Sequence, residues 1–132
     1  MIKGFEDKTY KLTPDEERSL AILVQAFSTM NTGQAAKITS TTMIERFKNI
    51  GVDIGGVRLR KLIQHIRVNN LVSGVCSDSK GYWIADNKRD YETTLQSLYD
   101  RISHQTATFN ALKKQYVEEY GPKHIPKPKP LL

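Results

Sequence analysis

The stretch GGVRLRKLIQHIRVNN, residues 55–70, decides the fold because its aliphatic side chains recur at helical spacing. Placed at 100° intervals, four of them fall within about 100° of one another, the width of a stripe that faces a core. These four are Leu59, Leu62, Ile63 and Ile66. The stretch therefore predicts an amphipathic helix over about residues 55–69 that buries this aliphatic face.

The opposite face of this helix is basic and contains no acidic residue. It comprises Val57, Lys61, Gln64 and Val68, flanked by Arg58 and His65 on one side and by Arg60 and Arg67 on the other. A solvated face usually mixes charge signs, because opposite charges four residues apart stabilise a helix by roughly a few tenths of a kcal/mol. The basic face therefore favours contact with a negatively charged partner. In the alternative it is an ordinary solvated surface, and Arg60 or Arg67 pairs with Asp53 or Asp78.

The placement of charge along the chain also favours a polyanionic partner. The 132 residues carry a formal charge of +6. The excess lies in residues 37–80, with 8 basic and 3 acidic side chains, and in residues 121–132, with 3 basic and none acidic. Nucleic acid and an acidic membrane surface are partners of this kind. Gly55 and Gly56 lie at the expected N-terminus of this helix and carry no side chains, so phosphate can approach the free N–H groups there. Glycines at such a position also serve close packing.

Capping residues predict two further helices before residue 55. Thr13 and Glu16 fit a capping box around a proline suited to the first turn, which predicts a helix over residues 14–29. A second helix is expected to start at a cap formed by Ser40 or Thr41 and to end before Gly51. Its inward residues are Met43, Ile44 and Phe47.

Short extended segments surround the basic helix, and residues 37–39 form one of them. Asp53 is expected to cap the basic helix itself. After that helix, two β-prone runs around a polar turn predict a hairpin over about residues 72–85. Tyr82 and Trp83 alternate there, so one of them faces the core.

Three segments together resemble the recognition helix and wing of small winged-helix proteins encoded by bacteriophages and prophages. They are Leu59-Arg60-x-x-Ile63-x-x-Ile66-Arg67, then Leu71-Val72, then Gly81-Tyr82-Trp83-Ile84. The resemblance covers about residues 13–85. It implies a mainly α fold with a small β-hairpin, a winged helix-turn-helix, whose third helix enters the major groove of DNA while the hairpin follows the backbone or minor groove.

The same resemblance implies which residues contact DNA. The groove-facing and phosphate-facing set is Arg46, Lys48, Gly56, Val57, Arg58, Arg60, Lys61, Gln64, His65 and Lys80. Arginine and lysine provide affinity through phosphate, whereas base choice needs shape-matched contacts. Gln64 is the side chain best suited to adenine. The hairpin tip, residues 77–80, holds one cation and one acid, which weakens the expected wing contact.

Residues 87–120 predict a long helix with a heptad pattern. Its core positions are Tyr91, Leu95, Leu98, Ile102, Gln105, Phe109, Leu112 and Tyr116, spaced alternately four and three residues apart. Such a series favours pairing with another helix, most simply a second copy, with Leu95, Leu98, Ile102, Phe109, Leu112 and Tyr116 forming the dimer contact. The alternative is a helix that folds back to complete a monomeric core.

The remaining residues indicate no enzyme, cofactor, metal site or small-molecule substrate. The length suits one domain with one core. The three histidines have no zinc-like spacing with the lone Cys76, which is expected to be a packing residue. No apolar run is long enough to span a membrane, and no secretory signal is evident, so a cytoplasmic protein is expected. Residues 1–12 are expected to form an arm and residues 121–132 a basic, proline-rich tail.

The sequence therefore predicts a non-enzymatic DNA-binding protein of phage or prophage type that acts in transcriptional regulation or DNA replication. Its expected partners are double-stranded DNA and a second copy of itself, with no membrane involved. The alternative is a protein-binding scaffold that uses the winged helix and the long helix without DNA.

Overall fold

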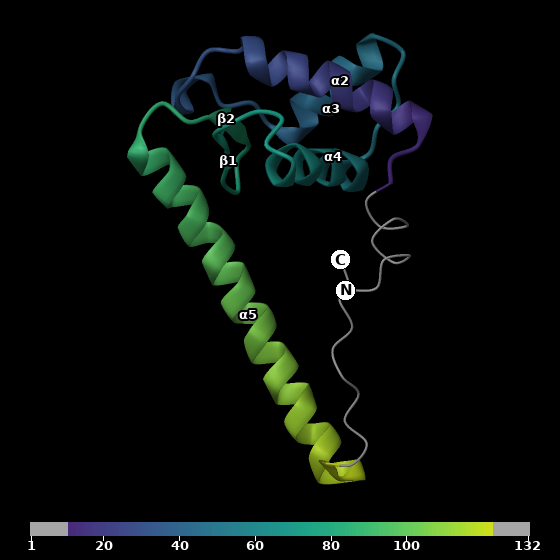
Figure 1. The fold of residues 1–132 in the computed structure, drawn as a ribbon, viewed down its shortest axis with the longest axis vertical. Coiled ribbons are helices and arrows are strands. Elements are labelled where there is room, and N and C mark those ends of the chain that lie inside the picture. The colour runs from purple at the N-terminus through teal and green to yellow at the C-terminus, as the bar shows by residue number, and fades with distance from the viewer. Residues whose placement is uncertain (1–10, 123–132) are drawn as a thin grey trace. The chain divides into compact units, whose positions relative to one another are not determined.

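A computed structural model describes residues 11–122 of the protein. These residues form four α-helices, a short 3-10 helix η1 (Gln34–Ala36) and a two-stranded antiparallel sheet, in the order α2, η1, α3, α4, β1, β2, α5 (Figure 1). The expected class, mainly helical with a small hairpin and a long C-terminal helix, is confirmed. The chain divides into a compact unit over residues 12–94 and a second unit that contains α5 from Leu95 onward. The predicted arm and tail lie almost wholly outside the described residues.

Helix α2 (Pro14–Thr29) has the predicted bounds and the predicted cap. The Thr13 hydroxyl accepts a hydrogen bond from the Glu16 backbone N–H at 3.1 Å, and the Glu16 carboxylate accepts one from the Thr13 N–H at 3.0 Å. Without these contacts, both N–H groups would lack a hydrogen-bond partner at the start of the helix. The reciprocal pair therefore fixes where α2 begins.

Two capping predictions for the next helices are wrong. Helix α3 (Ser40–Asn49) is capped by Thr39, whose hydroxyl accepts from the Thr42 N–H at 3.1 Å, so neither Ser40 nor Thr41 is the cap. Helix α4 (Gly56–Val68) is capped by Gly55 without a side-chain bond, because Asp53 lies two residues too early and the buried Ile54 follows it. Gly51, with φ +82°, follows the C-cap of α3 as expected.

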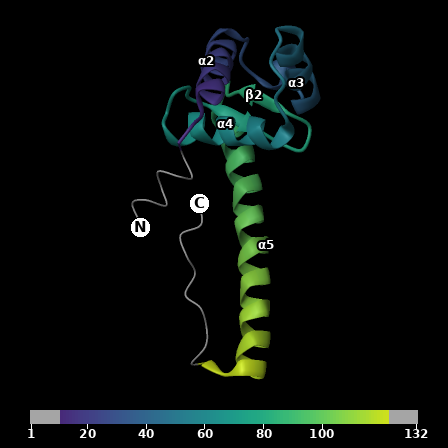
Figure 2. The ribbon, with the colours of Figure 1, turned by 90° about the vertical axis from the view of Figure 1, so that its right-hand side faces the viewer.

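Helix α4 supplies the centre of the core. Figures 1 and 2 show α2 and α3 on the same side of α4, and that side carries the predicted aliphatic face. The core residues are Leu23, Phe27, Met43, Phe47, Ile54, Leu59, Leu62, Ile63, Ile66, Val75 and Ile84. All four predicted aliphatic residues of α4 are at most 1% exposed, so the opposite face of α4 points to solvent.

The hairpin is tied to the segment between α2 and α3. Strand β1 (Val75–Ser77) pairs antiparallel with β2 (Tyr82–Ile84). Ile38 and Tyr82 exchange two backbone hydrogen bonds of 2.8 Å, so the short strand expected at residues 37–39 is reduced to a single bridge. A side chain at Gly81 would collide with the Ile38 carbonyl group, which explains a glycine at this close approach.

Helix α5 (Lys88–Tyr120) has 33 residues and is about 50 Å long at 1.5 Å per residue. Its first turns are packed within the compact unit. The Asn87 side chain accepts from the Asp90 N–H at 3.0 Å, and the buried Asp90 carboxylate accepts from the Asp86 N–H at 2.8 Å. The buried Thr94 hydroxyl accepts from the Ser77 N–H at 3.0 Å, which joins the helix to β1.

Candidate nucleic-acid interface

The exposed side of α4 presents most of the residues predicted to contact DNA. Val57, Arg58, Arg60 and Gln64 are exposed, while Lys61 and His65 are half-buried. We call these six residues the basic face. Among the described residues, neither Arg58 nor Arg60 forms an ion pair. The Arg60 guanidinium lies over Gly56, close enough that a side chain at Gly56 would contact it at 3.5 Å. A glycine there leaves room for Arg60 at the helix start.

Lys61 is held inside the fold. Its ammonium lies 3.1 Å and 3.0 Å from the two carboxylate oxygens of Glu16, so it joins α4 to the first turn of α2. Glu16 is only 6% exposed and Lys61 compensates its charge. The position of Lys61 on α4 was predicted, but its partner was not. Of the cations on the basic face, Arg58 and Arg60 are therefore the ones that are free of ion pairs with the described residues and can bind an anionic ligand.

The contacts of Glu16 predict an acid-sensitive fold. Hydrogen bonding by the Thr13 backbone N–H, aided by Lys61 and opposed by burial, lowers the pKa of Glu16 from its usual value of 4.5. A lowered folded-state pKa stabilises the protein above about pH 4.5, and the contribution is lost as pH falls through the folded-state value.

We expect Glu16→Gln to lower the free energy of unfolding at pH 7 by about 1 kcal/mol, because Lys61 loses its charged partner. The same variant should lose less stability than the parent between about pH 5 and 3. Urea unfolding at several pH values measures both effects. Glu17→Gln, an exposed change of the same charge, is the control, and equal effects of the two substitutions would contradict the assignment.

Arg67 supports the hairpin. Its Nε donates to the Val75 carbonyl at 2.9 Å and its Nη2 donates to the Ser77 hydroxyl at 3.0 Å, so the side chain runs from α4 to β1. These two hydrogen bonds join Arg67 to β1, whereas the sequence suggested Asp53 or Asp78 as its partner. This contact fixes the hairpin against the end of the helix that carries the basic face.

The acid at the hairpin tip is also neutralised. Asp78 forms an ion pair with Lys37, and its carboxylate accepts from the backbone N–H groups of Lys80 and Gly81. Burial opposes these contacts, but Lys37 and the two N–H groups outweigh it and lower the pKa of Asp78. The Lys37 ammonium lies 4.7 Å from the ring centre of the buried Trp83. Lys80 remains exposed at the tip.

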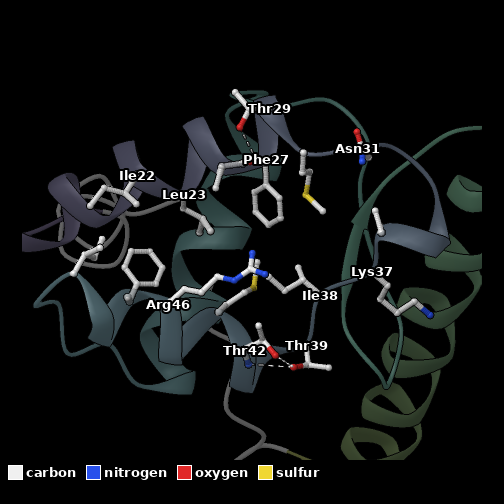
Figure 3. Close-up of a pocket in the computed structure, with 16 residues that line it drawn as sticks. Ile22, Leu23, Phe27, Thr29, Asn31, Lys37, Ile38, Thr39, Thr42 and Arg46 are labelled. Atoms are coloured by element: carbon white, nitrogen blue, oxygen red, sulfur yellow. Dashed lines mark hydrogen bonds between the residues drawn. The ribbon is translucent and has the colours of Figure 1, made fainter.

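The two predicted residues of α3, Arg46 and Lys48, are both exposed. Arg46 also lines a groove of about 690 Å³ between α2 and α3. Figure 3 shows Leu23 and Phe27 pointing from α2 into this groove and Arg46 reaching into it from α3. No residue of α4 lines the groove.

The groove was not predicted from the sequence, which indicated Met43 and Phe47 only as inward-facing residues of one helix. Its apolar lining is Ile22, Leu23, Ala26, Phe27, Met30, Ala36, Ile38, Met43, Phe47 and Ile50. Ile50 is exposed, and the half-buried Ile22 and Ile38 also reach it. The only local signal in the sequence was the apolar Ile50 after the end of α3.

The heptad residues of α5 form a second exposed surface. We call Tyr91, Leu95, Leu98, Ile102, Gln105, Phe109, Leu112 and Tyr116 the α5 stripe. Leu95 and Ile102 are each 61% exposed and Leu112 is 59% exposed, whereas Leu98 and Tyr116 are half-buried. Three large aliphatic side chains are thus exposed along one helix face.

The described residues contain no group of three histidine, cysteine, aspartate or glutamate side chains that could hold a metal ion. Within the same residues, no helix is both long and apolar enough to cross a membrane. Cys76 is buried, as expected for a packing residue, and burial raises the pKa of its thiol. Comparison of the chain with protein-family models, with curated proteins and with solved structures finds no match.

Proposed function

We propose that this protein is a winged-helix DNA-binding protein of phage or prophage type, with α4 as its recognition helix. The observation that carries the proposal is the basic face, which has two exposed arginines without an ion pair to the described residues and no acidic residue on the whole helix. Exposed arginines without an ion pair can bind DNA phosphates and the major-groove edge of guanine.

The arrangement of the other elements supports this proposal. A helix, a bridged segment, a second helix, α4 and a hairpin follow one another in the order typical of winged-helix domains. Gln64 is exposed for contact with adenine. Arg67 braces the hairpin against α4, with Lys80 exposed at the tip to contact the backbone.

In this proposal the protein is not an enzyme and acts in the cytoplasm, in transcriptional regulation or DNA replication. The α5 stripe joins two copies, so that two recognition helices are available for a site with two-fold symmetry. Lys48 would contact a flanking phosphate, since it is exposed on α3. Arg46 and Lys61 have smaller roles here, because one lines the groove and the other is paired with Glu16.

The test is a fluorescence anisotropy titration of the full chain against a labelled random-sequence duplex at several salt concentrations. We expect a Kd of about 1–100 μM near physiological salt, weakening steeply as salt is added. The logarithmic slope should be about 0.9 for each phosphate contacted. No binding even at about 50 mM salt would overturn the proposal, since nonspecific phosphate attraction is strongest there.

The groove between α2 and α3 favours a second function, a protein-binding module without DNA contact. A concave surface of about 690 Å³ with mostly apolar walls is of the kind that accepts an apolar side chain or helix from another protein. The alternative predicts that the titration fails. Replacing the exposed Ile50 with aspartate should then remove partner binding.

A further inference from the structure

The heptad positions of α5 continue beyond both ends of the α5 stripe. Lys88 occupies the next position before Tyr91, and Glu119 occupies the next position after Tyr116. Both side chains are exposed and carry opposite charges. What each of them faces in a second copy depends on whether the two helices run in the same or in opposite directions.

A parallel, in-register pair would bring like charges together. Every heptad residue then faces its own counterpart, so Lys88 meets the partner's Lys88 and Glu119 meets the partner's Glu119. The flanking positions would place Arg101 near the partner's Thr106 and offer no opposite charge. A parallel pair is therefore opposed electrostatically at both ends of the stripe.

An antiparallel pair has one register that covers the whole α5 stripe. In this direction each a position of the heptad faces a d position of the partner. The stripe begins with Tyr91 at a d position and ends with Tyr116 at an a position. The facing residues are Tyr91 with Tyr116, Leu95 with Leu112, Leu98 with Phe109, and Ile102 with Gln105. Each combination occurs twice, so the stripe is complementary to itself.

The same register pairs opposite charges. Lys88 faces the partner's Glu119 in the layer after Tyr91, and Glu92 flanks the interface beside the partner's Lys113. Each pair occurs twice by symmetry, which gives four attractive contacts. The side chains of these four residues are exposed in the single chain and available for pairing.

Registers shifted by one heptad lose these advantages. One shift sets Leu112 against the partner's Lys88, leaves Tyr116 beyond the end of the partner helix and sets Arg101 beside the partner's Arg101. The opposite shift sets Leu95 against the partner's Glu119 and leaves Tyr91 beyond the end of the partner helix. Exposed aliphatic surface and like charges both disfavour the shifted pairs.

We propose that α5 pairs antiparallel with α5 of a second copy, in the register that places Lys88 opposite the partner's Glu119. This inference rests on the dimer in the proposed function and gives its direction and register. Gln105 occupies the two central layers, where its polar side chain reduces stability and penalises other registers.

Charge reversal at the ends of the stripe tests the direction. Lys88→Glu should raise the dimer dissociation constant about tenfold, because two attractive pairs become repulsive. Lys88→Glu combined with Glu119→Lys should restore the parental value, since the pairs are then opposite again. Both changes also suit the helix dipole, so folding is not at risk. Sedimentation equilibrium in the absence of DNA gives the constants.

A parallel dimer would behave differently. Glutamate at position 88 would face glutamate, as lysine faces lysine in the parent, so both variants would keep the parental constant. That result would overturn the inference, as would a monomeric parent. Because no DNA is present, failure of DNA binding in the anisotropy titration leaves this experiment unaffected, and the two proposals fail separately.

Disulfide trapping provides an independent measurement of the register. In a background of Cys76→Ser, which removes the single cysteine of the chain, Leu95→Cys and Leu112→Cys are made as separate proteins. Mixed and oxidised, they should form the 95–112 heterodimer. Crosslinking of Leu95→Cys with itself would overturn the antiparallel arrangement.

Discussion

Arg58→Glu combined with Arg60→Glu should weaken binding to duplex DNA by at least about a hundredfold at constant salt. Each substitution removes a cation that the described fold leaves without an ion pair and adds repulsion from phosphate. The fold should survive, since both side chains are exposed. The anisotropy titration measures the change, and urea unfolding confirms that stability is retained.

A matched variant separates local contact from net charge. Arg89→Glu with Lys114→Glu makes the same change in charge at two exposed positions on α5. It should weaken binding only slightly, because these positions lie outside the basic face. Equal losses from the two double variants would mean that DNA is held by general attraction and that α4 is not the recognition helix.

Alanine variants count the phosphates that the basic face contacts. Arg58→Ala or Arg60→Ala should reduce the logarithmic salt slope by about 0.9 if the side chain binds one phosphate. A smaller change in slope with altered preference for one base would instead indicate contact with a base edge. Lys61 is unsuitable for this comparison, since Lys61→Ala would leave the buried Glu16 carboxylate without its ion-pair partner and destabilise the fold.

Ile102→Asp combined with Leu112→Asp should convert the dimer into a monomer. Two carboxylates per chain would have to be buried in the interface without partners, which costs several kcal/mol and corresponds to at least about a thousandfold in dissociation constant. Both side chains are about 60% exposed in the single chain, so the monomer should fold. Sedimentation equilibrium measures the mass directly.

The control for this variant carries the same charge on another side of α5. Ser103→Asp with Asn110→Asp places two carboxylates at exposed heptad positions away from the α5 stripe. This control should remain dimeric. A dimeric mass for Ile102→Asp with Leu112→Asp would show that the stripe is not the interface, whatever the direction of the helices.

Local patterns in the sequence were enough to predict most of the fold. The start of α2 follows from a capping box that involves only residues three apart, Thr13 and Glu16. The buried face of α4 follows from helical spacing of aliphatic residues, since burial of such a stripe is the main driving force for packing. The hairpin follows from two β-prone runs around a turn.

The partners of the charged side chains could not be predicted in the same way. Lys61 and Glu16 are 45 residues apart, and Lys37 and Asp78 are 41 apart, so only the tertiary fold brings each pair together. The sequence correctly predicted that the cations of α4 lie on the side of the helix away from the buried aliphatic face. It could not distinguish Arg58 and Arg60, which are offered to solvent, from Lys61 and Arg67, which hold the fold.

The position of Trp83 gives the protein an intrinsic optical probe. It is the only tryptophan in the chain, it lies in β2, and it is fully buried beneath the Lys37 ammonium. Its emission therefore reports on the compact unit and is insensitive to fraying of α5 beyond Leu95. Far-ultraviolet circular dichroism, in contrast, also reports on the 33 residues of α5. Recording both signals during one thermal melt would show whether the two units unfold together or in separate steps.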